Sequence, residues 1–323
     1  MSEKLKVLSL FSGIGAFEKA LTNLKIEYEI TNYCEINKDA AKCYSVIHNI
    51  PESKNLIDIQ TIDEKTLPKD LDLIVHGSPC QDYSIAGKEK GGDEGSGTRS
   101  SLLWDSVRII KETKPKYIVW ENVKNVLSKK HIHNFQKYLD ELESFGYVNY
   151  YKIFNAKNFK LPQSRERIFV VSIRKDIENH FDIENIKLSK KIIPIKDKCL
   201  NLSKIDEKYI CKRPLTLLTS KNKNDIITIG EVSKNSQGGK VYGIDGVFPT
   251  ICAGVHGYAM GYIYQDSKVR MITPEEVFVF MGFSKKDCKK CRDINMKDTP
   301  LYKMGGNSIA VNVLESIFKE LLI

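Results

Sequence analysis

The first half of the chain alternates short apolar, β-branched runs with segments that have a helical period. The apolar runs predict strands over residues 4–10, 29–34, 71–76, 117–120, 148–154 and 168–173. The periodic segments predict helices over residues 16–24, 38–48, 102–113 and 131–145, the second of them capped by Asn37. Strands that alternate with helices predict an α/β fold with a mostly parallel, doubly wound sheet.

The pattern changes after Lys175, where the helical period disappears. Short β-prone runs at 226–229 and 240–242 and a glycine-rich turn at 237–239 predict a smaller, irregular, β-rich domain. A helix returns after Thr273, with Pro274 in its first turn, and a final helix covers residues 308–322. We therefore expect three parts, with boundaries at 1–175, 176–269 and 270–323.

Composition adds few constraints. The longest apolar runs of the 323 residues are strand-sized and the N-terminus lacks a signal-like apolar region, so we expect a cytoplasmic protein with no membrane span. The eight cysteines should then be mostly free thiols. Cys288 and Cys291 have zinc-knuckle spacing without a second ligand pair, so we expect a solvated, lysine-rich turn and no metal. A net charge of +9 suits a polyanionic partner without requiring one.

Cys80 is the first candidate for chemistry. It follows the predicted strand 71–76 in a turn that Gly77 and Pro79 break, at the carboxyl edge where α/β proteins place their active sites. A buried structural cysteine would lie within the apolar run. Both a presented nucleophile and a small turn-filling residue fit this position equally well.

The loop of residues 11–15 is the second candidate. Gly13 and Gly15 permit a tight turn and close approach of a ligand, although Glu18 occupies the third glycine position of the dinucleotide fingerprint. Glu35, about 20 residues on, ends a strand where a carboxylate accepts hydrogen bonds from ribose hydroxyls. Phe11 could then cover an adenine. The alternative is helix-cap glycines and a surface glutamate.

Glu121 and two arginines complete the candidates. Glu121 follows a buried strand and would share an edge with Cys80 if the two strands are neighbours, where it could act as an acid near neutral pH. The alternative interpretation of Glu121 is a structural carboxylate at the end of the strand that caps Asn122 and Val123. Arg165 and Arg167 lie on one side of an extended segment and suit phosphate or a base edge, with ordinary surface charge as the alternative.

Taken together, these residues resemble the DNA (cytosine-5)-methyltransferases of bacterial and phage restriction–modification systems, in the family's order and over almost the whole chain. The similar motifs are residues 11–15, Glu35, Asp58-Ile59, Pro79-Cys80-Gln81 with Ser84, Gly97-Thr98-Arg99 with Leu102, Glu121-Asn122-Val123, Gln163 with Arg165 and Arg167, Arg270 with residues 273–276 and 281–283, and residues 306–308 with Val311. Ile36 departs from the pattern, since this position is often aromatic.

The resemblance implies a Rossmann-like, S-adenosylmethionine-dependent methyltransferase fold. The region 176–269 would be its target-recognition domain, and 270–323 would return to complete the catalytic domain. The implied catalytic residues are Cys80, Glu121, Arg165 and Arg167. The implied cofactor-binding residues are Phe11, Gly13, Gly15, Glu35, Ile36, Asp58, Ile59, Pro79, Leu102, Asn307 and Ser308. The implied DNA contacts are Gln81, Ser84, Gly87, Arg99 and Thr250.

The implied reaction methylates carbon 5 of a cytosine flipped out of a specific duplex sequence, through a covalent Cys80 adduct. Of the two arginines, Arg167 is the one expected to hold the flipped base at its exocyclic oxygen, and Arg165 would instead hold the backbone or the catalytic loop. The implied partner is duplex DNA bound by a nucleoid-associated monomer, and a cognate restriction endonuclease stays an open partner.

Three other functions stay open at this point. A tRNA methyltransferase of the same architecture would carry a Cys-Phe-Thr element, which the target region lacks. A nicotinamide-dependent oxidoreductase fits the glycine turn and Glu35 but leaves Cys80 and Glu121 unexplained. A non-catalytic DNA-binding protein would need neither of these two residues.

Overall fold

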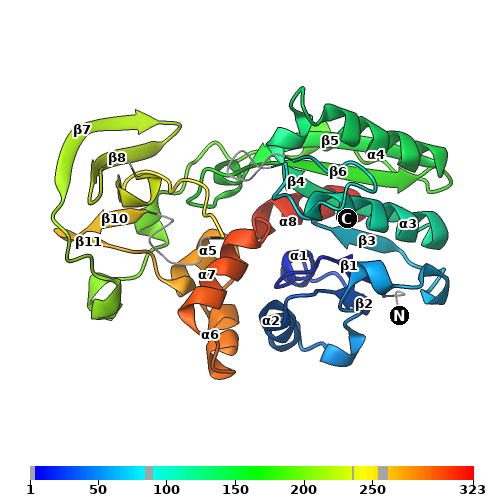
Figure 1. Ribbon diagram of the computed structural model, residues 1–323, viewed down its shortest axis with the longest axis horizontal. Helices are drawn as coiled ribbons and strands as arrows, with labels where there is room; N and C mark the ends of the chain where they lie inside the picture. The colour runs from blue at the N-terminus through cyan, green and yellow to red at the C-terminus, as the bar shows by residue number, and fades with distance from the viewer. Residues whose placement is uncertain (1–3, 84–89, 235, 254–260) are drawn as a thin grey trace. The chain divides into compact units, whose positions relative to one another are not determined.

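A computed structural model describes residues 4–83, 90–234, 236–253 and 261–323 (Figure 1). The chain forms two compact units. The first comprises Met1–Phe154, Glu166–Ile186 and Leu314–Ile323, and the second Asn155–Arg165 and Lys187–Val313.

The first unit contains a six-stranded sheet with the order β2-β1-β3-β4-β6-β5. Its strands are β1 (Leu5–Leu10), β2 (Tyr28–Cys34), β3 (Leu73–His76), β4 (Tyr117–Val123), β5 (Tyr147–Asn155) and β6 (Glu166–Arg174). The strands β2, β1, β3 and β4 are parallel to one another, whereas β6 runs antiparallel to β4. This sheet confirms the predicted α/β fold.

Among the described residues of this unit, the α-helices are α1 (Ala16–Asn23), α2 (Lys38–His48), α3 (Leu103–Thr113), α4 (Ile132–Ser144) and the C-terminal part of α8 (Val311–Leu322). The Asn37 side chain accepts a hydrogen bond from the Ala40 amide, as expected for the cap of α2. Side chains of α3 and α4 pack on β1, β3 and β4 in one buried apolar cluster, while α1 and α8 meet at Phe17 and Phe318. None of the helices in the described ranges combines the length and apolarity that a membrane span needs.

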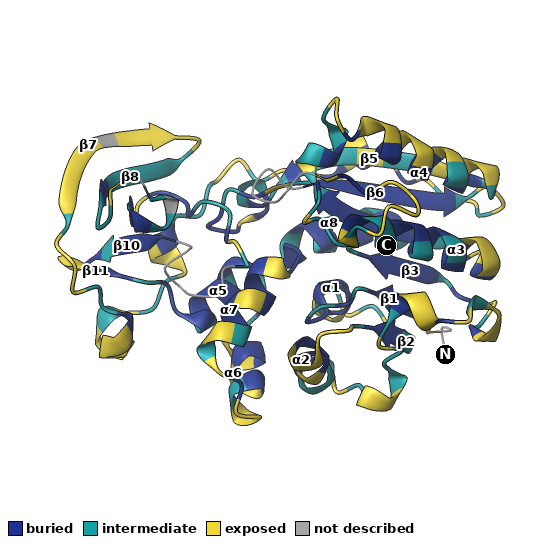
Figure 2. Ribbon diagram, in the orientation of Figure 1, coloured by how far each residue is buried: buried dark blue, intermediate teal, exposed yellow. Residues whose placement is uncertain are grey.

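The second unit contains a five-stranded sheet with the order β11-β10-β9-β8-β7. Its strands are β7 (Thr216–Lys223), β8 (Ile226–Glu231), β9 (Lys240–Gly243), β10 (Tyr262–Gln265) and β11 (Lys268–Arg270). Three helices follow: α5 (Pro274–Phe280), α6 (Lys285–Asp293) and α7 (Asp298–Asn307). The fully buried Arg270 guanidinium joins this sheet to α5 through Glu276 (Nη2 to Oε1, 2.7 Å). In Figure 2 the residues of β1, β3, β4 and β6 are mostly buried, whereas those of β7 are largely exposed.

Two local predictions are wrong. Residues 288–291 form part of helix α6, not a solvated turn, because their three-residue spacing puts Cys288 and Cys291 on one face, and both are fully buried there. Strand β4 continues to Val123, because β6 pairs with it as far as Arg167, so Glu121 lies within the strand. The helices of residues 285–307 belong to the second compact unit, and the predicted functional boundaries remain predictions.

Candidate active site

Cys80 and Glu121 come from neighbouring parallel strands. The register pairs His76, the last residue of β3, with Trp120 of β4, so the turn that carries Cys80 begins beside Glu121. Parallel neighbouring strands end at the same edge of a sheet. The strand that precedes Cys80 and the strand that carries Glu121 are neighbours, which is the condition under which the sequence placed these two residues at one edge. The Cys80 residue is half-buried, and all eight cysteines are thiols, as expected.

Hydrogen bonds from β4 hold the turn immediately before Cys80. The buried Ser78 hydroxyl accepts from Trp120 Nε1 (3.0 Å) and from Asn122 Nδ2 (3.2 Å). Asn122 Nδ2 also lies 3.2 Å from the Ser78 carbonyl oxygen. These contacts tie the nucleophile turn to the strand that carries Glu121. The sequence analysis did not single out Ser78, and no pattern in the chain marks it.

The residues after Cys80 are held as well. The Tyr83 amide donates to the Cys80 carbonyl (3.1 Å), and Asn125 Nδ2 donates to the Tyr83 carbonyl (2.6 Å). The Asp82 amide donates to Ser100 Oγ and the Ser100 amide donates to Asp82 Oδ2, each at 3.2 Å. Two predicted DNA contacts, Ser84 and Gly87, lie outside the described residues.

Glu121 is 7% exposed and forms an ion pair with Arg167, whose Nε lies 3.1 Å from Glu121 Oε1. Arg167 reaches it from β6, where it pairs with Val123 across the antiparallel ladder. A carboxyl group next to a partly buried guanidinium can bind both the ring nitrogen and the carbonyl of a pyrimidine.

Arg165 has different partners. Its guanidinium is 4% exposed and donates to the main-chain carbonyl oxygens of Ile251 (Nη1, 3.1 Å) and Ser308 (Nη2, 2.8 Å). These contacts favour the alternative in which Arg165 holds backbone.

The glycine loop and Glu35 lie together, as predicted. The Gly13 amide donates to Glu35 Oε2 (2.9 Å), and the Asn37 amide donates to Oε1 (2.7 Å). Both glycines have positive φ angles, +56° at Gly13 and +77° at Gly15. A Cβ atom at Gly15 would lie 2.1 Å from His48 Nε2, whereas one at Gly13 would meet nothing within 4 Å. The loop therefore packs on α2 at Gly15 and is open at Gly13.

Asn55, which the sequence analysis missed, organises the segment beside Glu35. Its Oδ1 accepts from the amides of Glu35 and Ile57, each at 3.0 Å, and its Nδ2 donates to the Glu35 carbonyl (3.0 Å). Ile36 and Ile57, next to these bonds, are 66% and 59% exposed. Large exposed apolar side chains beside a carboxylate suit the base and ribose of a nucleoside.

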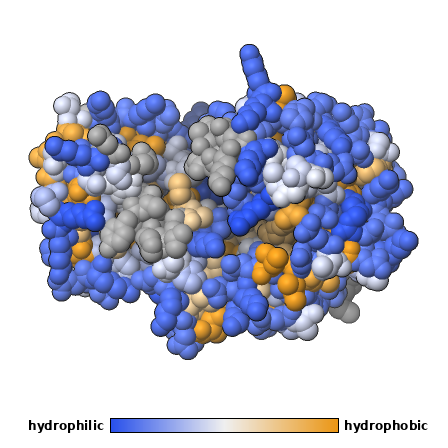
Figure 3. Space-filling model, in the orientation of Figure 1, coloured by the Kyte–Doolittle hydropathy of each residue, from blue (hydrophilic) through white to orange (hydrophobic). Residues whose placement is uncertain are grey.

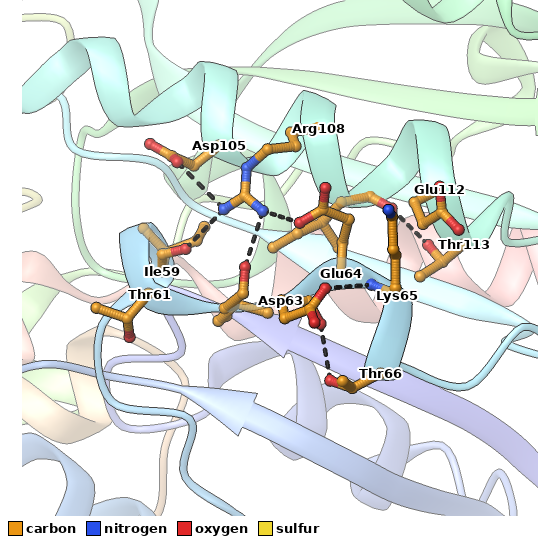
Figure 4. Close-up of polar contacts among 12 residues, drawn as sticks. Ile59, Thr61, Asp63, Glu64, Lys65, Thr66, Asp105, Arg108, Glu112 and Thr113 are labelled. Atoms are coloured by element: carbon orange, nitrogen blue, oxygen red, sulfur yellow. Dashed lines mark hydrogen bonds and ion pairs between the residues drawn. The ribbon is translucent and has the colours of Figure 1, made fainter.

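Arg108 of α3 fixes the next turn (Figure 4). Its guanidinium donates to the carbonyl oxygens of Ile59 (3.0 Å) and Ile62 (2.8 Å) and pairs with Glu64. Asp58 is half-buried and caps this turn through the Gln60 amide (3.1 Å). The Ile59 side chain is buried, so any ligand contact of this residue would use its backbone.

The remaining predicted site residues differ in exposure. Phe11, Pro79, Leu102 and Thr250 are half-buried, Gln81, Arg99 and Asn307 are exposed, and Ser308 is buried. The face seen in Figure 3 is largely hydrophilic, with apolar side chains in small groups. No group of three or more His, Cys, Asp or Glu side chains suited to a metal ion occurs among the described residues.

Comparisons with known proteins identify the family. The family model for C-5 cytosine-specific DNA methylases matches residues 5–322. The chain is 34% identical to the type II methyltransferase M2.ScrFI of Lactococcus lactis subsp. cremoris, over 98% of this chain and 99% of the relative. It is 31% identical to the type II methyltransferase M.HhaI of Haemophilus parahaemolyticus, over 97% and 93%.

Solved structures share the fold. The Entamoeba histolytica methyltransferase EhMeth matches with a TM-score of 0.76 at 18% identity, over 99% of this chain and 98% of that chain. The Dnmt2 methyltransferase of S. pombe matches with a TM-score of 0.70 at 18% identity, over 98% and 97%. The family match over nearly the whole length agrees with the thiol and the carboxylate on neighbouring strands, and this chain belongs to the C-5 cytosine-specific DNA methylase family.

Proposed function

We propose that this enzyme transfers a methyl group from S-adenosylmethionine to carbon 5 of a cytosine that is flipped out of a specific duplex DNA sequence. The observation that carries the proposal is the register of β3 with β4, which starts the Cys80 turn beside the ion pair of Glu121 with Arg167. One nucleophile and one acid–cation pair at a single sheet edge are what the activation of a cytosine ring requires.

Cys80 supplies the nucleophile. Its sulfur, as a thiolate, forms a bond to carbon 6 of the cytosine, and the electron pair of the ring double bond moves toward carbon 5 and nitrogen 3. After carbon 5 is methylated, its proton passes to water, and the bond between Cys80 and carbon 6 breaks to restore the ring. The contacts of Ser78 hold the turn in place through both steps.

Glu121 and Arg167 stabilise the activated ring. The Glu121 carboxylate, which pairs with Arg167 in the structure, takes up a proton from water and as the acid donates to nitrogen 3, where negative charge develops when Cys80 adds. Arg167, whose Nε lies beside this carboxyl group, donates to the exocyclic oxygen of the base. Because both side chains are mostly buried, their interactions with the ring are weakened little by water.

The residues around Glu35 fit an adenosine group. The open Gly13 backbone admits a ligand, Glu35 offers carboxylate oxygens for ribose hydroxyls, and the exposed Ile36 and Ile57 offer apolar surface for a base. Phe11, Gly15, Asp58, Ile59, Pro79 and Leu102, together with Asn307 and Ser308, are proposed as further cofactor contacts by family resemblance. S-adenosylmethionine, when bound, supplies an electrophilic methyl group.

A target cytosine must leave the duplex, since stacking hides carbon 6 from a thiol, at a cost of a few kcal/mol. We propose Gln81, Arg99 and Thr250, with Ser84 and Gly87, as residues that contact the opened DNA. We propose residues 176–269 as the target-recognition domain, whose lysines suit phosphate contacts. In the sequence, this proposed domain separates two proposed catalytic parts, residues 1–175 and residues 270–323.

Bisulfite sequencing of DNA from cells that express the chain tests this function. We expect 5-methylcytosine in one sequence context with the wild-type chain and none with Cys80→Ser. Incubation of the purified chain with tRNA and with duplex DNA in parallel tests the substrate. Methylation of tRNA alone would contradict the proposal, as would unchanged modification by Cys80→Ser.

A further inference from the structure

Two distant segments of the second unit run side by side. The Phe248 amide donates to the Pro162 carbonyl and the Ser164 amide donates to the Phe248 carbonyl, each at 2.8 Å. Thr250 continues the pairing with its hydroxyl, which donates to the Ser164 carbonyl at 2.8 Å. The backbone around Thr250, a proposed DNA contact, is therefore fixed to the segment that contains Arg165.

Two buried side chains of that segment hold Ile251. Gln163 Oε1 accepts from the Ile251 amide (3.0 Å), and Arg165 Nη1 donates to the Ile251 carbonyl (3.1 Å). Gln163 is fully buried and also donates to the Phe280 carbonyl at the end of α5 (3.1 Å). Both polar groups of the Ile251 backbone are thus bound by side chains.

Arg165 extends the link to a third segment. Its Nη2 donates to the Ser308 carbonyl at 2.8 Å, next to the exposed Asn307 at the end of α7. An independent contact joins the same two segments, because a Cβ atom at Gly306 would lie 2.4 Å from the Cys252 oxygen and 2.7 Å from the Ala253 nitrogen. The backbone after Thr250 therefore packs directly on the backbone before Ser308.

We propose that Arg165 is a positioning residue that couples the DNA-contacting Thr250 segment to the cofactor-contacting Asn307–Ser308 segment. The inference rests on the proposed function, which assigns ligands to these two segments. A ligand that orders residues 307–308 would then also order residues 250–253, and by linkage DNA bound at Thr250 would favour the cofactor. This role replaces the catalytic role that the resemblance gave to Arg165.

The geometry explains why an arginine is required. A guanidinium is planar and presents several N–H donors in a fixed fork, so that one group can bind two carbonyl oxygens at once. A lysine has a single nitrogen on a flexible stem and does not hold the same two oxygens in a fixed arrangement. Arg165→Lys should therefore keep the positive charge and lose the coupling.

Hydrogen–deuterium exchange of the full chain, with and without S-adenosylhomocysteine, tests the coupling without turnover. In the wild-type chain we expect the ligand to slow exchange in residues 305–310 and also, by about 5-fold or more, in residues 250–253. In Arg165→Lys we expect the first effect to remain and the second to fall below about 2-fold. The matched control Arg174→Lys, which changes an arginine paired with Asp176, should behave like the wild-type chain.

Several results would overturn the coupling. One is slower exchange in residues 305–310 of the wild-type chain with no change in 250–253, and this result needs no variant. Another is equal slowing of 250–253 in Arg165→Lys and the wild-type chain. Gly306→Ala gives a second variant, in which the new Cβ must displace the Cys252 backbone and should also uncouple the segments. If the ligand slows no amide at all, the proposed cofactor itself is wrong, and the coupling with it.

Discussion

Removal of the Ser78 hydroxyl tests whether β4 holds the nucleophile turn. In the wild-type chain this oxygen accepts from the indole nitrogen of Trp120 and from the side-chain Nδ2 of Asn122, and all three side chains are buried. In Ser78→Ala, Asn122 keeps its bond to the Ser78 main-chain oxygen, whereas the Trp120 N–H loses the partner seen in the structure.

A buried donor without a partner costs about 1–3 kcal/mol, and we expect Ser78→Ala to lower the free energy of unfolding by that amount. If the whole cost fell on the transition state of Cys80 attack, adduct formation would slow by about 5-fold to 150-fold, since 1.36 kcal/mol is a factor of ten. Because the cost need not fall wholly on the transition state, about 150-fold is the upper limit of the expected slowing of adduct formation.

Urea unfolding and the rate of Cys80 adduct formation on 5-fluorocytosine DNA measure the two effects. Ser106→Ala is the matched control, because the buried Ser106 hydroxyl has no hydrogen-bond partner among the described residues. We expect its unfolding free energy to stay within about 0.5 kcal/mol of wild type. If Ser78→Ala matched this control in both measurements, the turn would not depend on β4 as we infer.

Three further predictions concern a buried histidine, the proposed ribose carboxylate and a glycine with positive φ. Burial lowers the pKa of His76 from 6.5 in the unfolded chain to about 3 in the folded chain. Below pH 6.5 the unfolded chain therefore binds a proton that the folded chain does not bind, and the free energy of unfolding decreases as the pH falls from 6.5 toward 3. We expect urea unfolding to show that the wild-type chain loses about 2 kcal/mol more than His76→Gln between pH 7 and pH 5, and equal losses would refute this. Glu35→Ala should weaken S-adenosylhomocysteine binding in calorimetry by about 10-fold to 150-fold, through lost charge-assisted hydrogen bonds of about 1.5–3 kcal/mol, and unchanged affinity would contradict its ribose role. Gly15→Ala should lower the thermal midpoint by several degrees, because its Cβ would meet His48 and its φ is positive, and a wild-type midpoint would contradict the loop geometry.

Local patterns predicted much of the first unit. Asn37 caps α2 as expected, and the apolar runs before Cys80 and Glu121 form neighbouring strands. These features depend on residues close together in the chain, where periodicity and capping chemistry act directly. The order of the strands was not predicted, because the sequence left open whether the strands before Cys80 and Glu121 are neighbours; the structure shows that they are.

Contacts between distant residues could not be predicted. Arg165 binds carbonyl oxygens at Ile251 and Ser308, and a main-chain oxygen carries no sequence signal. Asn55 and Arg108 also act on backbone groups and look like ordinary surface residues in the sequence. The prediction of a turn at residues 288–291 is wrong because it rested on their lysines, whereas the three-residue spacing of the cysteines forms a buried helix face.

Trapping of Cys80 on DNA tests the central claim most directly. The substrate is duplex DNA that contains 5-fluorocytosine at every cytosine. Carbon 5 of this base cannot lose its fluorine after methylation, so the covalent bond between Cys80 and carbon 6 should persist. With S-adenosylmethionine present, we predict that mass spectrometry finds one modified peptide, which contains Cys80, and no adduct with Cys80→Ser. An adduct at another residue, or none with the wild-type chain on DNA that it methylates, would contradict the account.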